Sequence, residues 1–187
     1  SPSSVTTAKC IAFSYPLARQ SKLGLLMDLV NGYDIDGIFL DYCRYPENTA
    51  QPQYACGFYG YDTPLIQQCQ SQYGFDPRTE PVGTPTWDLF NGLRIQSVNT
   101  FVGELRSAIA ASGHNVAIAG FGDSTLDNDL CAARDWSAWS QAGLIDEMFL
   151  GNYMEPIGNM RQVLANARQL VGPNVVLHGT LTTYNNM

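Results

Sequence analysis

The run from Tyr33 to Pro46 constrains the fold of this chain most strongly. Gly37–Leu40 is a continuous apolar stretch, and a carboxylate, a guanidinium and two phenols follow it closely. This pattern predicts a strand of a parallel sheet that is covered on both faces. Polar groups at the carboxyl end of such a strand stand where α/β barrels and doubly wound sheets place their chemistry. Asp41 is therefore the first candidate for a catalytic group, and an ion pair with Arg44 is the structural alternative.

Strand and helix patterns alternate along the rest of the chain, which predicts a parallel α/β sheet. We expect one domain over residues 1–187, with five strands, four or five helices and a long irregular loop at 46–64 that borders a cleft. The expected strands are 10–15, 37–41, 116–121, 147–153 and 174–182. The expected helices are 19–31, 64–73, 87–112, 135–142 and 160–170.

Composition and charge exclude several classes of partner. The net charge is −7 and the ten basic residues are scattered, whereas nucleic-acid binding needs clustered Lys and Arg. No apolar stretch approaches the roughly 20 residues that a membrane-spanning helix needs. The segment Gly120–Gly122 lacks the later glycine of a dinucleotide fingerprint. We therefore expect no nucleic acid, no membrane span and no cofactor.

Five cysteines suggest an oxidising compartment, so we expect a secreted or extracellular protein. Cys56 and Cys69 flank a loop and are candidates for a disulfide that staples it. The spacing does not fix the pairing, and an odd count leaves one thiol unpaired or paired to another chain. No CxxC pair occurs and the chain has only two histidines, so we expect no metal site.

Polar and aromatic residues follow most of the expected strands, and parallel strands bring such residues to one end of a sheet. Glycoside cleavage needs one acid that protonates the leaving oxygen and a second that attacks the anomeric carbon or activates water. Aromatic rings stack on sugars, and Asn and Arg read hydroxyl groups. The candidates are Tyr15, Asp41, Tyr42, Arg44, Asp123, Asn152, Tyr153, Glu155 and His178.

Several of these residues also have a purely structural interpretation. Asp123 is able to cap a turn, Asn152 to satisfy backbone groups, and Glu155 to stand as a solvated loop residue beside a proline. His178 lies within an expected strand, where a hydrogen-bonded core histidine is the commoner case. Trp136 and Trp139 are expected to pack in the core.

Four segments resemble the glycoside hydrolase family 10-like proteins, which are bacterial (β/α)8 barrels of glycosidase type. Residues 33–46 are similar to the family signature YDVDGIxxDYxRYP, and 73–78 to its segment YGxDPR. Residues 135–146 resemble DWxxWxxxGLID, and Gly151–Tyr153 stands where the family often has Met-Asn-Tyr. The segments occur in the family's order and the resemblance spans about residues 10–182.

The resemblance implies a TIM-type (β/α)8 barrel of which this chain covers roughly strands 3–7. The chain is then a fragment, or another chain or copy completes the barrel. Asp41 becomes the catalytic carboxylate of strand four. The second acid is Asp123 after strand five, Glu155 after strand six, or a residue of the strands that this chain lacks. Cys43 stands where chitinase-type barrels carry their catalytic Glu, which disfavours that mechanism.

The leading hypothesis is a hydrolase of O-glycosidic bonds in a poly- or oligosaccharide. Asp41 acts as nucleophile or stabiliser, and Asp123 or Glu155 as general acid. Tyr15, Tyr42, Arg44, Asn152, Tyr153 and His178 bind the sugar. The alternative is a non-catalytic protein that uses a hydrolase-like scaffold to bind glycan or to build an extracellular assembly.

Overall fold

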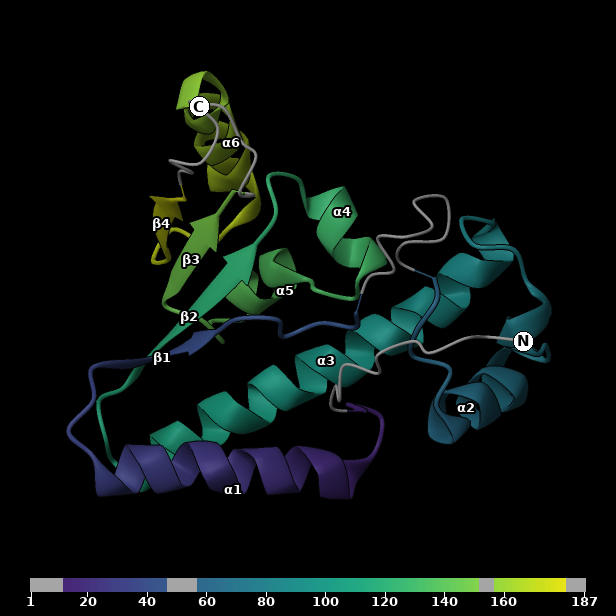
Figure 1. The fold of residues 1–187 in the computed structure, drawn as a ribbon, viewed down its shortest axis with the longest axis horizontal. Coiled ribbons are helices and arrows are strands. Elements are labelled where there is room, and N and C mark those ends of the chain that lie inside the picture. The colour runs from purple at the N-terminus through teal and green to yellow at the C-terminus, as the bar shows by residue number, and fades with distance from the viewer. Residues whose placement is uncertain (1–11, 47–56, 152–156, 181–187) are drawn as a thin grey trace, which may run out of the picture.

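The computed structural model describes residues 12–46, 57–151 and 157–180, and its centre is a four-stranded parallel sheet (Figure 1). The strands are β1 (Gly37–Leu40), β2 (Ala117–Gly122), β3 (Glu147–Leu150) and β4 (Val176–Gly179). They lie side by side in the order of the chain. The predicted α/β class is confirmed. Sequential order is the pattern of a barrel segment, whereas a doubly wound sheet reverses its order at a switch point.

One helix precedes β1 and the others lie in the crossovers between strands, and local sequence sets several of the helix ends. The helices are α1 (Pro16–Gly32), α2 (Thr63–Tyr73), α3 (Pro85–Ser112), α4 (Leu126–Cys131), α5 (Trp136–Gln141) and α6 (Ile157–Leu170), with a 3-10 turn η2 at Pro77–Thr79. The Thr84 hydroxyl accepts the Trp87 N–H at 3.2 Å and caps α3. Gly113 ends α3 with a φ of 76°. None of the described helices is long and apolar enough to cross a membrane.

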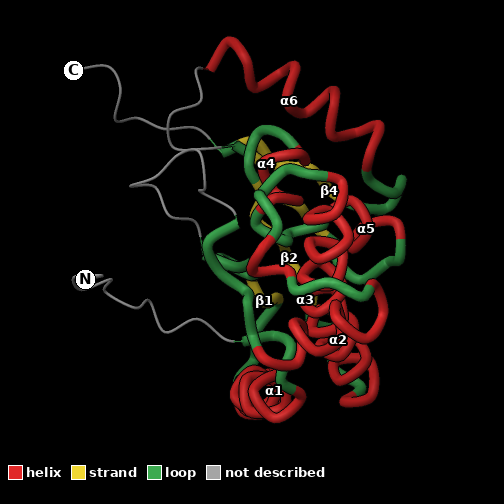
Figure 2. The backbone as a smooth tube through the Cα atoms, turned by 90° about the vertical axis from the view of Figure 1, so that its right-hand side faces the viewer, coloured by secondary structure: helices red, strands yellow, loops and turns green. Residues whose placement is uncertain are grey.

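The sheet is covered on one face only by the described part of the chain. Helices α2, α3 and α5 lie together on one side of the strands (Figure 2). Burial alternates along each of the first three strands, so that one face packs against the helices and the other is more exposed. The buried side chains are Ile38, Leu40, Ile118, Met148 and Leu150.

We call the opposite side the open face and define it by Phe39, Phe121, Phe149 and His178. Phe39 is 49% exposed, so the prediction that β1 is covered on both faces is wrong for the described residues. The rings come from all four strands and contact one another, with centroids 5.2 Å apart for Phe39 and Phe149 and 4.2 Å apart for Phe149 and His178. An apolar face of this kind is usually covered in a folded domain.

Other differences from the predicted elements have local causes. Residues 12–15 form a turn rather than a strand, because the Tyr15 N–H bonds the Ala12 carbonyl at 3.1 Å before Pro16 starts α1. Residues 10 and 11 lie outside the described part. The strands β3 and β4 are shorter than expected, and the described part holds four strands rather than five. Helix α4 was not expected, because it shows too little apolar periodicity over six residues.

The cysteines correct one expectation. Cys69 is a free, buried thiol, so the predicted Cys56–Cys69 disulfide is wrong. Cys43 is likewise free and buried. Cys131 at the end of α4 is disulfide-bonded.

Substitution of Gly122 by Ala tests the close packing at the carboxyl end of β2. A Cβ atom there would lie 2.4 Å from the Met148 methyl carbon and 2.9 Å from both Asp129 Oδ2 and Trp136 Cδ1. We expect the free energy of unfolding in urea to fall by about 1–3 kcal/mol, as in overpacked cores.

Gly103→Ala in α3 is the matched control, because no heavy atom lies within 4 Å of its added Cβ. Ala favours helix, so this variant should be neutral or up to about 1 kcal/mol more stable. Equal effects of the two substitutions would contradict the packing described for Gly122.

Candidate active site

A pocket of about 320 Å³ opens beside the carboxyl end of β1. Its apolar wall consists of Phe13, Leu26, Ile38, Phe39, Leu40 and Phe101. Its polar groups come from Lys22 on α1 and from Asp41, Tyr42, Cys43 and Arg44, which follow β1. Apolar walls with a few converging polar groups are typical of ligand sites.

The backbone after β1 turns sharply and thereby presents Asp41 and Tyr42. Tyr42 has a φ of 53°, a left-handed conformation that is uncommon for a bulky residue. Such conformations concentrate at functional sites, because the surrounding structure must hold them. The Arg44 N–H bonds the Tyr42 carbonyl at 2.7 Å and closes this turn. Asp41 and Tyr42 are both exposed at the mouth of the pocket.

The Arg44 side chain lies over the Tyr42 ring rather than beside Asp41. Its guanidinium carbon is 5.2 Å from the centroid of that ring, and its Nη1 donates to the Tyr45 carbonyl at 3.3 Å. Among the ion pairs of the described residues, none joins Asp41 to Arg44. The structural alternative for Asp41, an ion pair at the strand end, is therefore wrong for this structure.

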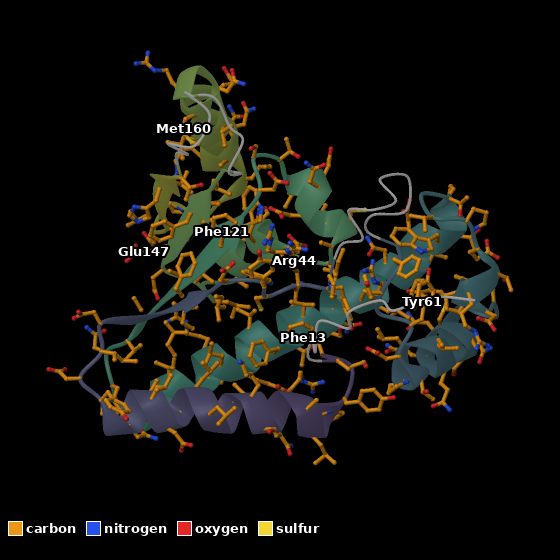
Figure 3. The ribbon with its side chains drawn as sticks, viewed as in Figure 1. Phe13, Arg44, Tyr61, Phe121, Glu147 and Met160 are labelled. Atoms are coloured by element: carbon orange, nitrogen blue, oxygen red, sulfur yellow. The ribbon has the colours of Figure 1, made fainter. Side chains whose placement is uncertain are left out.

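Asp123 follows the neighbouring strand at the same end of the sheet. Leu40 of β1 is in register with Gly120 of β2, so Asp123 stands two residues further along than Asp41. Asp41 directly follows β1 and Asp123 directly follows β2, so both stand at the carboxyl end of the sheet. Figure 3 shows Phe121 on β2 and Arg44 in the loop after β1.

The Asp123 carboxylate is held by local donors. Its Oδ1 accepts the Ser124 N–H at 2.7 Å, and its Oδ2 accepts from Asn128 Nδ2 at 3.4 Å. The turn-capping interpretation of Asp123 is thus compatible with the structure. The Asp123 side chain stays half-buried, at the same end of the sheet as Asp41.

Beneath Asp123 lies a buried cluster that the sequence did not indicate. Asp129 and Arg134 are 1% and 4% exposed and form an ion pair. Asp129 Oδ2 accepts the indole N–H of Trp136 at 2.6 Å and the backbone N–H of Asp123 at 2.8 Å. Trp136 and Trp139 are both buried, as expected.

A second polar network anchors the loop after β1 to the helices. The Tyr45 hydroxyl lies 3.2 Å from Ser97 Oγ and donates to Asp62 Oδ2 at 3.4 Å. Ser14 Oγ donates to the same Asp62 oxygen at 2.9 Å. Burial raises the pKa of Tyr45 above its ordinary value. These bonds hold the end of the loop while Asp41 and Tyr42 stay exposed.

The remaining candidates lie further away or outside the described part. Tyr15 is at the start of α1 and is 40% exposed. His178 lies within β4, where its Nε2 is 2.7 Å from Glu147 Oε2 on β3. Asn152, Tyr153 and Glu155 lie outside the described residues. In the described ranges, no group of three or more His, Cys, Asp or Glu side chains is arranged to hold a metal ion.

Comparison with known families identifies a match over most of the chain. The family described as glycosyl hydrolase-like 10 matches residues 8–176 of this chain. No curated protein matches it. The match includes β1 with its following loop, β2, α5 and β3, so the resemblance noted in the sequence is confirmed.

Cys43 provides a test of the interior side of the pocket. Burial raises the pKa of its thiol to about 12, against smaller opposing effects of Arg134 and Lys22. Because the thiolate is the reactive form, we expect iodoacetamide at pH 8 to leave Cys43 unmodified in the native protein and to modify it in guanidinium. Peptide mass mapping measures both, and rapid labelling of native Cys43 would contradict its burial.

Proposed function

Because this chain belongs to the glycosyl hydrolase-like 10 family, we propose that it cleaves O-glycosidic bonds of a poly- or oligosaccharide. The observation that carries the proposal is the position of Asp41 and Asp123. They directly follow neighbouring parallel strands and therefore share the carboxyl end of the sheet. Two acids at one site are the requirement of glycoside hydrolysis.

The strand geometry supports a suitable separation of the two acids. Neighbouring strands lie about 4.8 Å apart and each residue advances about 3.3 Å, so a shift of two residues puts the Cα atoms roughly 8 Å apart. Glycosidase carboxyl groups stand roughly 5–10 Å apart, the shorter range in retaining and the longer in inverting enzymes. The side chains of Asp41 and Asp123 are long enough to reach either range.

We assign the roles from exposure and contacts. Asp41 is exposed in the pocket and acts on the anomeric carbon as nucleophile or stabiliser. Asp123 is half-buried and hydrogen-bonded, and it protonates the leaving oxygen; Glu155 is the other candidate for this role. Tyr42 and Arg44 form a stacked pair that offers a ring face and hydrogen-bond donors to a sugar. Tyr15, Asn152, Tyr153 and His178 are further sugar-binding candidates, and a secreted location agrees with a polysaccharide substrate.

We also propose that the four strands belong to a (β/α)8 barrel, in which β1–β4 are strands 4–7. Three surfaces support this assignment. The open face has exposed aromatic side chains, Val176 on the terminal strand β4 is 53% exposed, and α1 exposes Leu17, Leu25 and Leu29. A closed barrel buries the inner face of its sheet and leaves no strand edge. Its helices form an outer ring, in which a helix such as α1 has a neighbour on each side.

Asp41→Asn is the direct test of the proposed chemistry. We expect turnover of both 2,4-dinitrophenyl and 4-nitrophenyl glycosides to fall at least about a thousand-fold, because loss of a nucleophile affects every substrate. Asp123→Asn should spare the dinitrophenyl substrate, whose leaving group needs no proton. Circular dichroism checks that the fold is kept.

Asp34→Asn is the control, because Asp34 is exposed and precedes β1 at its other end. Unchanged turnover in Asp41→Asn would contradict the catalytic assignment. Glycan binding without turnover in the wild-type protein would instead support the binding protein considered from the sequence.

Barrel completion makes a separate prediction about size. The native polypeptide should exceed the 20.5 kDa of this chain, or the chain should associate with a second chain. Intact mass spectrometry and light scattering after gel filtration measure these two quantities. A native protein that is monomeric, stable and 20.5 kDa in mass would contradict barrel completion.

A further inference from the structure

The buried ion pair at the end of β2 is not explained by stability alone. Asp129 and Arg134 are almost completely withdrawn from water, and their removal from water costs several kcal/mol per ion. Apolar residues of similar size often stabilise such a position equally well. The contacts of the pair indicate what its charges provide.

The Asp129 carboxylate joins three segments. Its Oδ1 accepts from Arg134 Nε at 2.7 Å and from Arg134 Nη2. Its Oδ2 accepts the Trp136 indole N–H at 2.6 Å and the Asp123 backbone N–H at 2.8 Å. The exit of β2, the end of α4 and the start of α5 therefore converge on one side chain. Hydrogen bonds to an ionised group are short, strong and directional.

Arg134 extends the same unit to the open face. Its guanidinium carbon lies 5.8 Å from the centroid of the Phe121 ring, two residues before Asp123. The pair thus contacts β2 on both sides of Gly122. No Cβ fits at Gly122, where Asp129 Oδ2 would be 2.9 Å away.

The unit also reaches the loop after β1. Ala133 adopts a φ of 64° between Asp129 and Arg134, and the neighbouring Ala132 carbonyl accepts the Tyr45 N–H at 2.9 Å. Arg134 N–H bonds the Asp129 carbonyl at 2.8 Å, which closes the turn. The loops that carry Asp41 and Asp123 are therefore fixed to the same buried turn.

We propose that Asp129 is a positioning residue that holds Asp123 in place as the general acid through the Asp123 backbone N–H. The inference rests on the proposed glycosidase function. Burial raises the pKa of Asp129 to about 6, and the Arg134 guanidinium opposes the rise. At neutral pH the carboxylate is ionised and matches its four donors.

Asp129→Asn tests the proposal, because the amide keeps the shape but offers only one acceptor oxygen to the donors around it. A misplaced general acid slows substrates that need a proton more than those that do not. We expect turnover of 4-nitrophenyl glycoside to fall at least about ten-fold more than that of 2,4-dinitrophenyl glycoside. In an Asp123→Asn background, the same substitution should no longer change this ratio.

Amide hydrogen exchange gives a readout that does not depend on activity. The Asp123 N–H should exchange slowly in the wild-type protein and faster in Asp129→Asn, while amides within β2 keep their protection. Asp127→Asn on the exposed side of α4 is the control and should change neither measurement. Trp136→Phe keeps the ion pair and the ring, and should shift the ratio of turnovers in the same direction by less.

The outcomes separate the two proposals. The positioning role would be overturned if Asp129→Asn lowered the turnover of both glycosides by the same factor, so that their ratio stayed unchanged. Unchanged exchange at Asp123 in Asp129→Asn would overturn it as well. Unchanged turnover in Asp41→Asn would overturn the proposed function, but it would leave the hydrogen bond between Asp129 and the Asp123 N–H intact, which hydrogen exchange tests separately.

Discussion

Backbone hydrogen bonds between four parallel strands, added in the order of the chain, determine where the other parts of this structure lie. Each parallel pairing needs a crossover, and right-handed crossovers between strands in sequential order place their helices on the same side. The helices therefore bury Ile118, Met148 and Leu150 on one face. Phe39, Phe121 and Phe149 consequently collect on the other, and all residues that follow the strands collect at one end.

The polar interior is concentrated where the loops leave the strands. The side chains facing the helices from β1, β2 and β3 are apolar, whereas Asp129, Arg134 and Tyr45 are buried beside the loops that follow β1 and β2. Buried polar groups cost free energy unless every partner is in place, and they then favour one arrangement over its alternatives. The strained Tyr42 conformation needs such support. The loops after β1 and β2 thus have defined positions although Asp41 and Tyr42 are exposed.

The sequence predicted the parts of the fold that depend on local pattern. The apolar run Gly37–Leu40 gave the position of β1, and the periodicity of α3 gave that helix nearly to its ends. The alternation of elements gave the α/β class. The sequence pattern did not reveal the open face, because the exposure of Phe39 depends on which segments cover the sheet. The turn at 12–15 was mistaken for a strand, since Ile11 and Phe13 have the composition of one.

The candidate site was likewise predicted only where local sequence pattern indicates it. Asp41 and Asp123 follow apolar strands, and parallel topology is enough to bring them to one end. Asp129 gave no such signal: it lies two residues from the exposed Asp127 in a short helix, and its partner Arg134 is beyond that helix. Only the fold distinguishes a buried carboxylate with four donors from a solvated neighbour.

The pocket beside β1 connects the fold to the proposed chemistry. Its wall includes Ile38 and Leu40 from one face of β1 and Phe39 from the other, with Asp41 directly after the strand. The pocket therefore extends around the edge of β1. An added strand would fill the apolar length of that edge and leave its carboxyl end open. Asp41 would then lie between Asp123 on one side and the end of the added strand on the other. Under the proposed function, a sugar chain needs contacts on both sides of the cleaved bond, and a completed barrel would provide them.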